Sequence, residues 1–245
     1  MRKSGVRIAV ILAMIVGLSS MAYAEGTKVT VGIKAWSNSW EEEVEYNGGG
    51  SDTWDNGSSL MIGPSVNLRF ENNMFLGASY LVSTKDYESN DWVVIGDSVS
   101  FEREDLDLTV GYMINPRFGV FVGYKSIEFD ATYHLPALGI DEKIGTVSLK
   151  GPGIGILGNI PLSESLALYG NLAIMSLDQK ISTDIGSASS DMTGASFEIG
   201  VAFAFSESFS ANVGIKSQSF SGDDEFGDTY TETFAGLTFG ANYTF

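Results

Sequence analysis

Histidine, the residue most often used as a general base, occurs once in this chain of 245 residues, as His134 in the stretch DATYHLPALG. An imidazole can move a proton in hydrolysis if a nucleophile and an orienting carboxylate lie beside it. The acid that precedes it most closely is Asp130, four residues earlier. A lone histidine in a polar stretch is most often a surface residue, so we expect no enzyme, with a surface hydrolase that uses His134 as the alternative. Cysteine is absent, which excludes disulfides and thiolate metal sites.

Carboxylates are the second reactive group, with 31 Asp and Glu against 14 Lys and Arg. Most lie in five long stretches at about 37–59, 84–100, 128–144, 178–193 and 220–232, which we interpret as loops. A solvated, repulsive surface is the simpler interpretation. Hard oxygens also suit Ca²⁺ or Mg²⁺. No cofactor is expected, and the alternative of a cation at the loops rests on Asp223, Asp224, Glu225 and Asp228, which do not follow the EF-hand spacing.

Apolar residues alternate with small or polar ones in ten short runs punctuated by Gly, Asn, Asp and Ser. This period predicts β-strands, which would position the groups named above. In FSANVGIKSQ, for example, Val213 and Ile215 share one face, whereas Asn212 and Lys216 share the other. In the run TVSLKGPGIGILGN the apolar residues change phase at 151–153, so we predict a β-bulge at this Gly-Pro-Gly sequence.

The connections between these runs alternate in length. Those at about 71–74, 114–117, 161–165 and 206–208 are tight, whereas the five acidic stretches are long. This rhythm is typical of an outer-membrane barrel, and the glycine-rich face suits a confined interior better than the surface of a soluble β-sandwich. The predicted fold class is all-β, an up-and-down antiparallel transmembrane β-barrel of about ten strands, with eight as the alternative. Closure requires the last strand to pair with the first, at 28–36.

The beginning of the chain has the order of a secretory signal peptide. Three basic residues precede an apolar run from Ile8 to Leu18, and small residues at Ala22 and Ala24 indicate cleavage after Ala24. The run is too short to span a bilayer as a helix. We expect residues 1–24 to be a signal peptide and residues 25–245 a single barrel domain in the cell outer membrane.

The interior of this barrel is predicted to carry charges of both signs. Buried charges must be paired or hydrated, so we expect a salt-bridged plug, with a narrow hydrated path as the alternative. Ten strands enclose little more space than the side chains of an eight-stranded barrel fill, which argues against a wide porin-like channel. The predicted lumen-lining charged residues are Lys34, Arg69, Glu71, Arg103, Asp105, Asp107, Lys125, Lys150, Glu198 and Lys216.

The last eight residues, TFGANYTF, run as polar, any, glycine, any, any, hydrophobic, any and terminal aromatic. This order resembles the C-terminal signal of bacterial outer-membrane β-barrel proteins. The resemblance implies recognition by the barrel-assembly machinery through Thr238, Gly240, Tyr243 and Phe245. It says little about function, because that superfamily includes pores, adhesins, enzymes and inert anchors.

Enzymatic barrels are a poorer match. Barrel proteases of the omptin type resemble this chain in strand number, but the four-residue spacing of Asp130 and His134 is not their Asp-x-His pattern. A histidine in a long loop also does not fit the lipid-facing His-Ser arrangement of barrel lipid A deacylases. We therefore expect a non-enzymatic outer-membrane barrel whose long acidic extracellular loops serve surface interaction or envelope structure. The alternative is a narrow porin-like channel for small solutes. The expected partners are outer-membrane lipid, lipopolysaccharide and the assembly machinery, with no nucleic acid.

Overall fold

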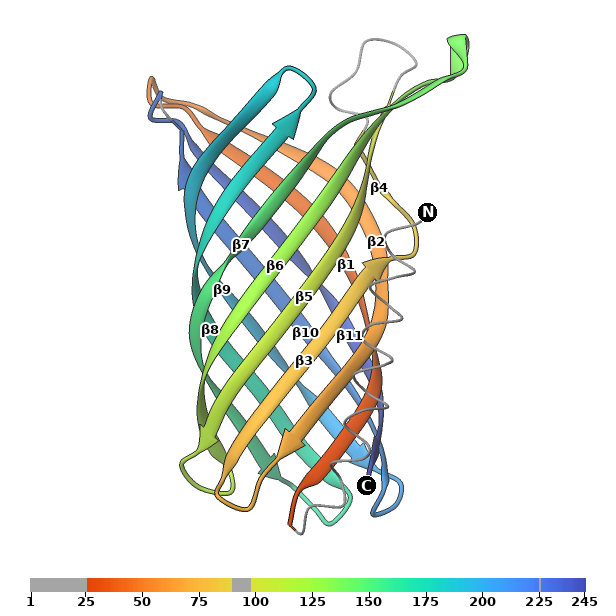
Figure 1. Ribbon diagram of the computed structural model, residues 1–245, viewed down its shortest axis with the longest axis vertical. Helices are drawn as coiled ribbons and strands as arrows, with labels where there is room; N and C mark the ends of the chain where they lie inside the picture. The colour runs from red at the N-terminus through yellow and green to blue at the C-terminus, as the bar shows by residue number, and fades with distance from the viewer. Residues whose placement is uncertain (1–25, 90–97, 225) are drawn as a thin grey trace.

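The protein is a closed antiparallel β-barrel (Figure 1). The structure, a computed structural model, describes residues 26–89, 98–224 and 226–245. The predicted signal peptide, residues 1–24, lies outside the described residues. No helix in the described part of the chain is both long and apolar enough to cross a membrane. The strands are β1 (Lys28–Glu45), β2 (Ser51–Arg69), β3 (Met74–Ser83), β4 (Tyr87–Ser89), β5 (Ser98–Met113), β6 (Phe118–Leu135), β7 (Ile140–Pro161), β8 (Leu166–Thr183), β9 (Gly186–Ala204), β10 (Phe209–Asp223) and β11 (Thr229–Thr244), with a 3-10 turn, η2 (Pro136–Leu138), before β7.

Two pairings close the barrel. β1 pairs with β11, as Val31 with Tyr243 and Ala35 with Phe239, and β3 pairs with β5. The short segment β4 continues the wall above β3, since it pairs with the upper part of β5. The eleven segments therefore occupy ten places in the barrel, and the predicted ten-stranded up-and-down topology is confirmed.

The tight turns were predicted correctly and the long loops were not. The strands end at Arg69, Met113, Pro161 and Ala204, so short turns close one end of the barrel at 70–73, 114–117, 162–165 and 205–208. At the other end, most of the expected loop residues are in strands, and the described connections shrink to tips at 46–50, 136–139, 184–185 and 224–228, while 84–86 joins β3 to β4 within the wall. The wall therefore rises well beyond the height that lipid requires, as the long hairpins in Figure 1 show.

The side of the wall that is apolar reverses part-way up. In β6, Val120, Val122 and Tyr124 face outward, whereas Ile127 and Phe129 above them face inward and are buried. The same change separates Ile215 from Phe220 in β10 and Leu237 from Phe234 in β11. We call the part below the change the lower half and the part above it the upper half. The lower half carries an outer apolar band, which ends in the exposed aromatic residues Tyr112, Phe118, Phe205, Phe209, Tyr243 and Phe245.

This reversal corrects the prediction for β7. No bulge lies at 151–153, because Tyr124, Lys125 and Ser126 pair with Pro152, Gly151 and Lys150 in unbroken register. The change of apolar phase that suggested a bulge is the passage from the lower to the upper half, where Leu149 turns inward into the core. The register shifts instead between Ser39 and Glu41 and between Ala131 and Thr132.

Candidate functional site

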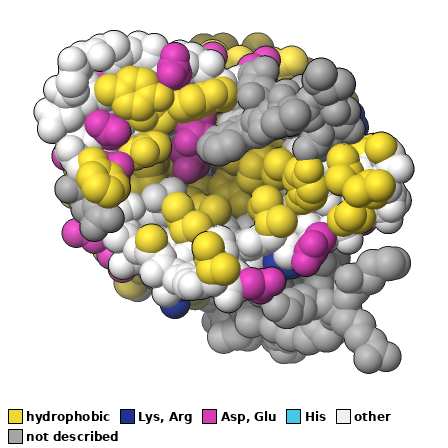
Figure 2. Space-filling view, turned by 90° about the horizontal axis from the view of Figure 1, so that it is seen from above, with side chains coloured by type: hydrophobic (Ala, Val, Ile, Leu, Met, Phe, Trp, Pro, Cys, Tyr) yellow, Lys and Arg dark blue, Asp and Glu magenta, His cyan; other side chains and the backbone are white. Residues whose placement is uncertain are grey.

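The lumen is filled across the upper half by a layer of apolar side chains, which we call the aromatic layer. Trp40 stacks on Phe129 and Phe234, with ring centroids 4.8 and 5.6 Å apart, and Tyr87 and Phe101 meet it edge-on. All the residues of the layer itself are buried: Trp36, Trp40, Met61, Leu81, Tyr87, Ile127, Phe129, Leu149, Leu177, Met192, Phe220 and Phe234. Figure 2, which looks into this end of the barrel, shows hydrophobic side chains in the hollow and acidic ones around it.

Arg103 lies directly against the aromatic layer. Its guanidinium is 3.8 Å from the ring centroid of Phe234 and about 5 Å from the rings of Trp36 and Phe129. It donates two hydrogen bonds to Asp105, Nε to Oδ1 at 2.7 Å and Nη2 to Oδ2 at 2.9 Å. Such a bidentate pair against aromatic faces is a geometry that arginine provides and lysine does not. Arg103 therefore joins the apolar layer to the charged groups beneath it.

A network of opposite charges continues downward from Asp105. Lys125 donates to Asp105 at 3.3 Å and to Asp107 at 2.9 Å. Lys216 lies 3.9 Å from Asp107 and places its ammonium 4.6 Å from the ring centroid of Trp36. Because each charge in this network has an opposite partner or an aromatic face, the network supports the expected salt-bridged plug.

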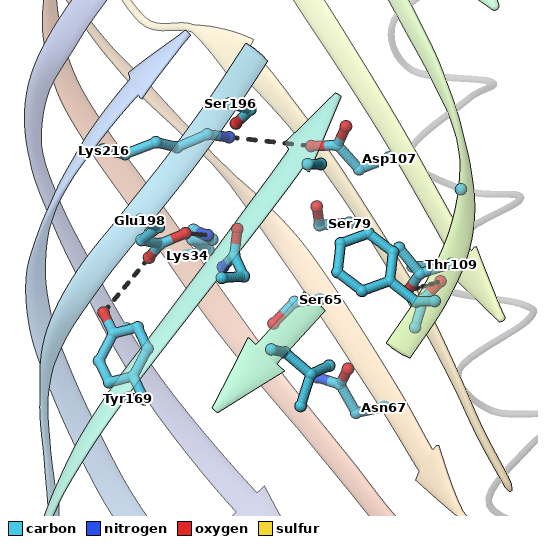
Figure 3. A pocket seen from close by; sticks show the side chains of 18 of the residues that line it. Lys34, Ser65, Asn67, Ser79, Asp107, Thr109, Tyr169, Ser196, Glu198 and Lys216 are labelled. Carbon is cyan, nitrogen blue, oxygen red and sulfur yellow. Dashed lines mark hydrogen bonds and ion pairs between the residues drawn. The ribbon is translucent and has the colours of Figure 1, made fainter. Parts of the chain in front are cut away.

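A second pair lies across the lumen. Lys34 donates to Glu198 Oε2 at 2.7 Å and Tyr169 donates to Oε1 at 3.2 Å (Figure 3). Thr238 also donates to Oε1, at 3.0 Å. These residues come from β1, β8, β9 and β11, which with β10 are consecutive in the wall, so the contacts brace one side of the barrel. We call Arg103 with Asp105, Asp107, Lys125, Lys216, Lys34 and Glu198 the charged layer.

Below the charged layer the lumen holds a cavity of about 620 Å³. Its walls carry polar side chains such as Asn67, Thr109 and Asn212 between apolar ones such as Phe75 and Phe121. Glycines such as Gly240 line it, and a Cβ there would collide with the Asn212 side chain. The cavity reaches residues close to the short turns, including Thr30, Ser210 and Thr244, so it belongs to the lower half.

The structure places seven of the ten predicted lumen charges in the charged layer and three elsewhere. Lys150 faces outward and lies 3.7 Å from Glu128, because the predicted bulge that would have turned it inward does not exist. Arg69 is exposed at the last position of β2, and Glu71 is exposed in the turn that follows. These two residues lie at the rim of the barrel, where the strand ends and its alternation no longer directs side chains into the lumen.

The four residues of the terminal signal lie on both faces of β11. Thr238 is buried in the lumen and Gly240 faces the cavity, whereas Tyr243 and Phe245 are exposed on the outside and meet edge-on at 4.9 Å. The amide of Phe245 still donates to the carbonyl of Val29 at 2.9 Å. The last residue of the chain is therefore part of the wall.

The acidic candidates for a cation site accept hydrogen bonds within the tips between strands. Asp224 Oδ1 accepts hydrogen bonds from the backbone amides of Phe226 and Asp228, Asp223 accepts one from Thr229, and Asp228 accepts one from the amide of Asn47. Glu225 lies outside the described residues. No group of three or more His, Asp or Glu in the described ranges has the geometry to hold a metal ion. At the neighbouring tip, the hydrogen bond that Tyr46 donates to Asp52 raises the pKa of the Tyr46 phenol.

The single histidine has partners that the sequence did not suggest. His134 Nε2 lies 2.7 Å from Ser100 Oγ, and His134 Nδ1 lies 2.7 Å from Asp141 Oδ1. Asp130, the acid that precedes it in sequence, instead pairs with Lys143 at 2.6 Å. Strand pairing could have shown this, since β6 sets His134 beside Ser98 on β5 and beside Asp141 on β7.

Comparison with solved structures gives a fold match to a membrane β-barrel of known structure. The outer membrane protease OmpT of Escherichia coli superposes with a TM-score of 0.55 at 14% identity, over 91% of this chain and 98% of that chain. The toluene transporter TodX of Pseudomonas putida gives 0.37 at 9% identity, over 91% and 90%. Ail, the attachment invasion locus protein of Yersinia pestis, gives 0.31 at 14% identity, over 90% and 99%. At these identities the likeness to OmpT concerns the fold alone, and the other two are too distant to support an argument.

Sequence comparison identifies the family. A search of curated proteins gives no match. The family model described as outer membrane protein beta-barrel domain matches residues 96–245, which is more than half of the chain. The outward apolar band and the closed wall fit that description, and they place the protein in the outer membrane. This chain belongs to the outer membrane protein beta-barrel domain family.

Proposed function

We propose that this outer-membrane barrel acts through its extracellular upper half, in surface interaction or envelope structure, and not as a passage for solutes. The observation that carries the proposal is the aromatic layer, whose side chains are buried across the width of the lumen. Water and ions do not cross a packed apolar layer without disrupting it, because polar groups lose their hydration there. OmpT is a protease, but this chain shares only its fold.

The alternative of a narrow channel is supported by the cavity of about 620 Å³ beneath the charged layer. Conductance across planar lipid bilayers separates the two functions. We expect no steady single-channel steps from the wild type. Phe234→Ala, which removes a ring from the aromatic layer, should give steps more often than Phe239→Ala, which removes an outward ring from the same strand. Wild-type steps of constant size would overturn the proposal in favour of the channel.

The outer face of the upper half supports the surface role. Its outward positions carry many carboxylates, among them Glu41, Glu43, Glu102, Glu104 and Glu128. Beside lipopolysaccharide phosphates such a surface is repulsive unless divalent cations bridge the two. We therefore expect Mg²⁺ to increase the binding of the purified barrel to lipopolysaccharide aggregates. The double substitution Glu41→Gln and Glu43→Gln should reduce that increase. Equal binding with Na⁺ at matched ionic strength would remove the bridging role.

Biogenesis is the other part of the proposal. We infer that the barrel-assembly machinery recognises the terminal strand through Thr238, Gly240, Tyr243 and Phe245. The outward position of Tyr243 and Phe245 supports this inference, because these two side chains are free of the lumen contacts that hold Thr238.

A further inference from the structure

Ser100, His134 and Asp141 form a chain of two short hydrogen bonds on the outer face of the upper half. The imidazole contacts the serine hydroxyl through Nε2 and the carboxylate through Nδ1, each at 2.7 Å. Three neighbouring strands hold the three side chains, β5, β6 and β7, so backbone pairing fixes their spacing. A hydroxyl on one imidazole nitrogen and a carboxylate on the other is the arrangement in which histidine activates a serine.

We propose that Ser100 is a nucleophile, His134 its general base and Asp141 the residue that positions the imidazole, and that the set hydrolyses acyl esters. This proposal goes beyond the surface role and does not depend on whether the lumen conducts. It adopts the alternative from the sequence, a surface hydrolase that uses His134, in place of the expectation that the chain is not an enzyme.

The reaction needs only water besides the ester. The Ser100 hydroxyl gives its proton to His134 Nε2 as Oγ bonds to the ester carbonyl carbon. The carbon–alkoxy bond then breaks, and the leaving alcohol takes the proton from His134. Water next gives a proton to His134 and its oxygen to the acyl carbon. The bond to Oγ breaks, Ser100 regains the proton, and the carboxylic acid leaves.

The surroundings restrict the substrate. Glu88 lies opposite Ser100 on β4, Glu142 adjoins Asp141, and Asp86 Oδ2 lies 3.2 Å from Ser100 Oγ as a second acceptor for its proton. An anionic ester would be repelled by these carboxylates, so the substrate class is an uncharged or cationic ester. Ser100 is only 4% exposed, while the His134 side chain is 31% exposed. A short acyl group approaching over the imidazole therefore fits better than a long or branched one.

The height of the cluster separates it from the lipid chains. Along β5, the outward residues above Leu106 are Glu104, Glu102 and then Ser100. Six residues of tilted strand place Ser100 roughly 14 Å above the apolar band. The substrate is accordingly a soluble ester outside the cell, and not an acyl chain buried in the membrane.

Labelling with a small fluorophosphonate tests the nucleophile directly, because the reagent reacts with an activated serine whatever its natural substrate. We expect the detergent-folded protein to be labelled at Ser100, as located by mass spectrometry. His134→Ala should slow the labelling at least about 100-fold, as expected when the general base of such a set is removed. The matched controls are Ser98→Ala, which removes the serine paired with His134 in the strand register, and Asp130→Asn, and both should label at the wild-type rate.

Two further measurements keep the test independent of folding defects. Each variant is compared only after its heat-modifiable migration on a gel shows a folded barrel. Because the chain has one histidine, ¹⁵N shifts of a single imidazole report its tautomer. We expect the proton on Nδ1 in the wild type and a mixture of tautomers in Asp141→Asn, together with slower hydrolysis of p-nitrophenyl acetate. Wild-type labelling no faster than that of folded His134→Ala, or an unchanged tautomer in Asp141→Asn, would overturn the proposal.

Discussion

The lower and upper halves of the barrel use the same closed backbone with opposite side-chain arrangements. In the lower half, apolar residues such as Ile156 and Val213 face lipid, and the interior holds many polar side chains and a cavity. In the upper half, the apolar residues fill the interior and carboxylates face outward. What surrounds the wall decides this difference, since lipid accepts apolar side chains and water does not. In a strand that passes from lipid to water, the apolar residues must therefore change from the outward to the inward face.

The charged layer lies at the junction of the two halves. Arg103 contacts the aromatic layer above, and Asp105 and Lys125 connect it to the polar lumen below. These three residues are almost completely buried. The junction is therefore held by pairing between charges, whereas the side-chain arrangement of each half is set by the medium around it, lipid below and water above.

The largest predicted effect comes from breaking that junction. Asp105→Ala leaves the guanidinium of Arg103 buried without its bidentate acceptor, which should lower the free energy of unfolding by about 3–5 kcal/mol. Urea unfolding of the barrel from lipid vesicles, followed by tryptophan fluorescence, measures the change.

The matched control for this prediction is the pair of Lys150 and Glu128 on the outer face. Both side chains are partly exposed, so Lys150→Met should cost no more than about 1 kcal/mol. Similar losses in the two variants would mean that the charged layer is hydrated and that the junction does not differ from the surface.

The second prediction places one charge on either side of the boundary. Ile156 and Ser148 are outward residues of the same strand, β7, the first within the apolar band and the second above it. Ile156→Lys should cost about 2–4 kcal/mol, because it places a charge among lipid chains. Ser148→Lys, between Glu128 on β6 and Lys180 on β8, should stay within about 0.5 kcal/mol of the wild type because the opposite and the like charge offset each other at the water-exposed surface. Equal costs would show that the outer boundary is misplaced, and the same vesicle unfolding assay decides.

The sequence predicts the lower half well for a physical reason. Lipid outside and a confined polar interior impose strict alternation, so the faces of residues such as Val122, Lys125 and Lys216 follow from their positions. The short turns follow from the ends of these runs. The upper half was expected to be loops because its outward residues are polar, as soluble loops are, and its strands are visible only through the inward residues.

The aromatic layer and the histidine cluster show what the sequence left hidden. Trp36, Trp40 and Val44 recur at every fourth position of β1, and this inward period continues the strand beyond its predicted end at Trp36. That signal is present in the sequence, but its apolar residues stand at the inward positions, whereas the lipid-facing residues lower in the strand stand at the outward ones. The contacts of His134 with Ser100 and Asp141 depend on the register of two strand pairs, which no local pattern determines.

The third prediction separates stability from assembly at the end of the lower half. Deleting Phe245 removes an outward side chain and the hydrogen bond to Val29, and should cost about 1.5–3 kcal/mol in refolded protein. Because the residue also belongs to the proposed assembly signal, the yield of folded barrel in cells should fall by more than this loss of stability explains. Deleting Phe245 and substituting Phe239→Ala should weaken the refolded barrel to a similar degree, but only the deletion should impair assembly. Equal cellular yields would remove the signal role.

The smallest predicted effect concerns calcium and the acidic upper half. If the acidic stretches were loops that bind a cation, millimolar calcium would protect those from Glu41 and from Asp223 against proteases. In the structure both stretches are strands, with Glu41 paired to Thr233 and Asp223 to Thr229, so their backbone is already protected. Limited proteolysis should therefore cut at the tips, such as 46–50 and 136–139, with or without calcium.

Among the tips that the structure describes, the one at 224–228 leaves room for a calcium effect. Its carboxylates already accept backbone hydrogen bonds, so any cation must compete with the amides of Phe226 and Asp228. A site with a dissociation constant of about 1 mM would slow cleavage about twofold at 1 mM calcium. Asp224→Asn should remove that protection, and sodium at equal ionic strength should not provide it. Equal protection by sodium would identify screening as the cause. Cleavage within 37–45 would show instead that the upper wall opens, and the two halves would then differ in stability as well as in which face is apolar.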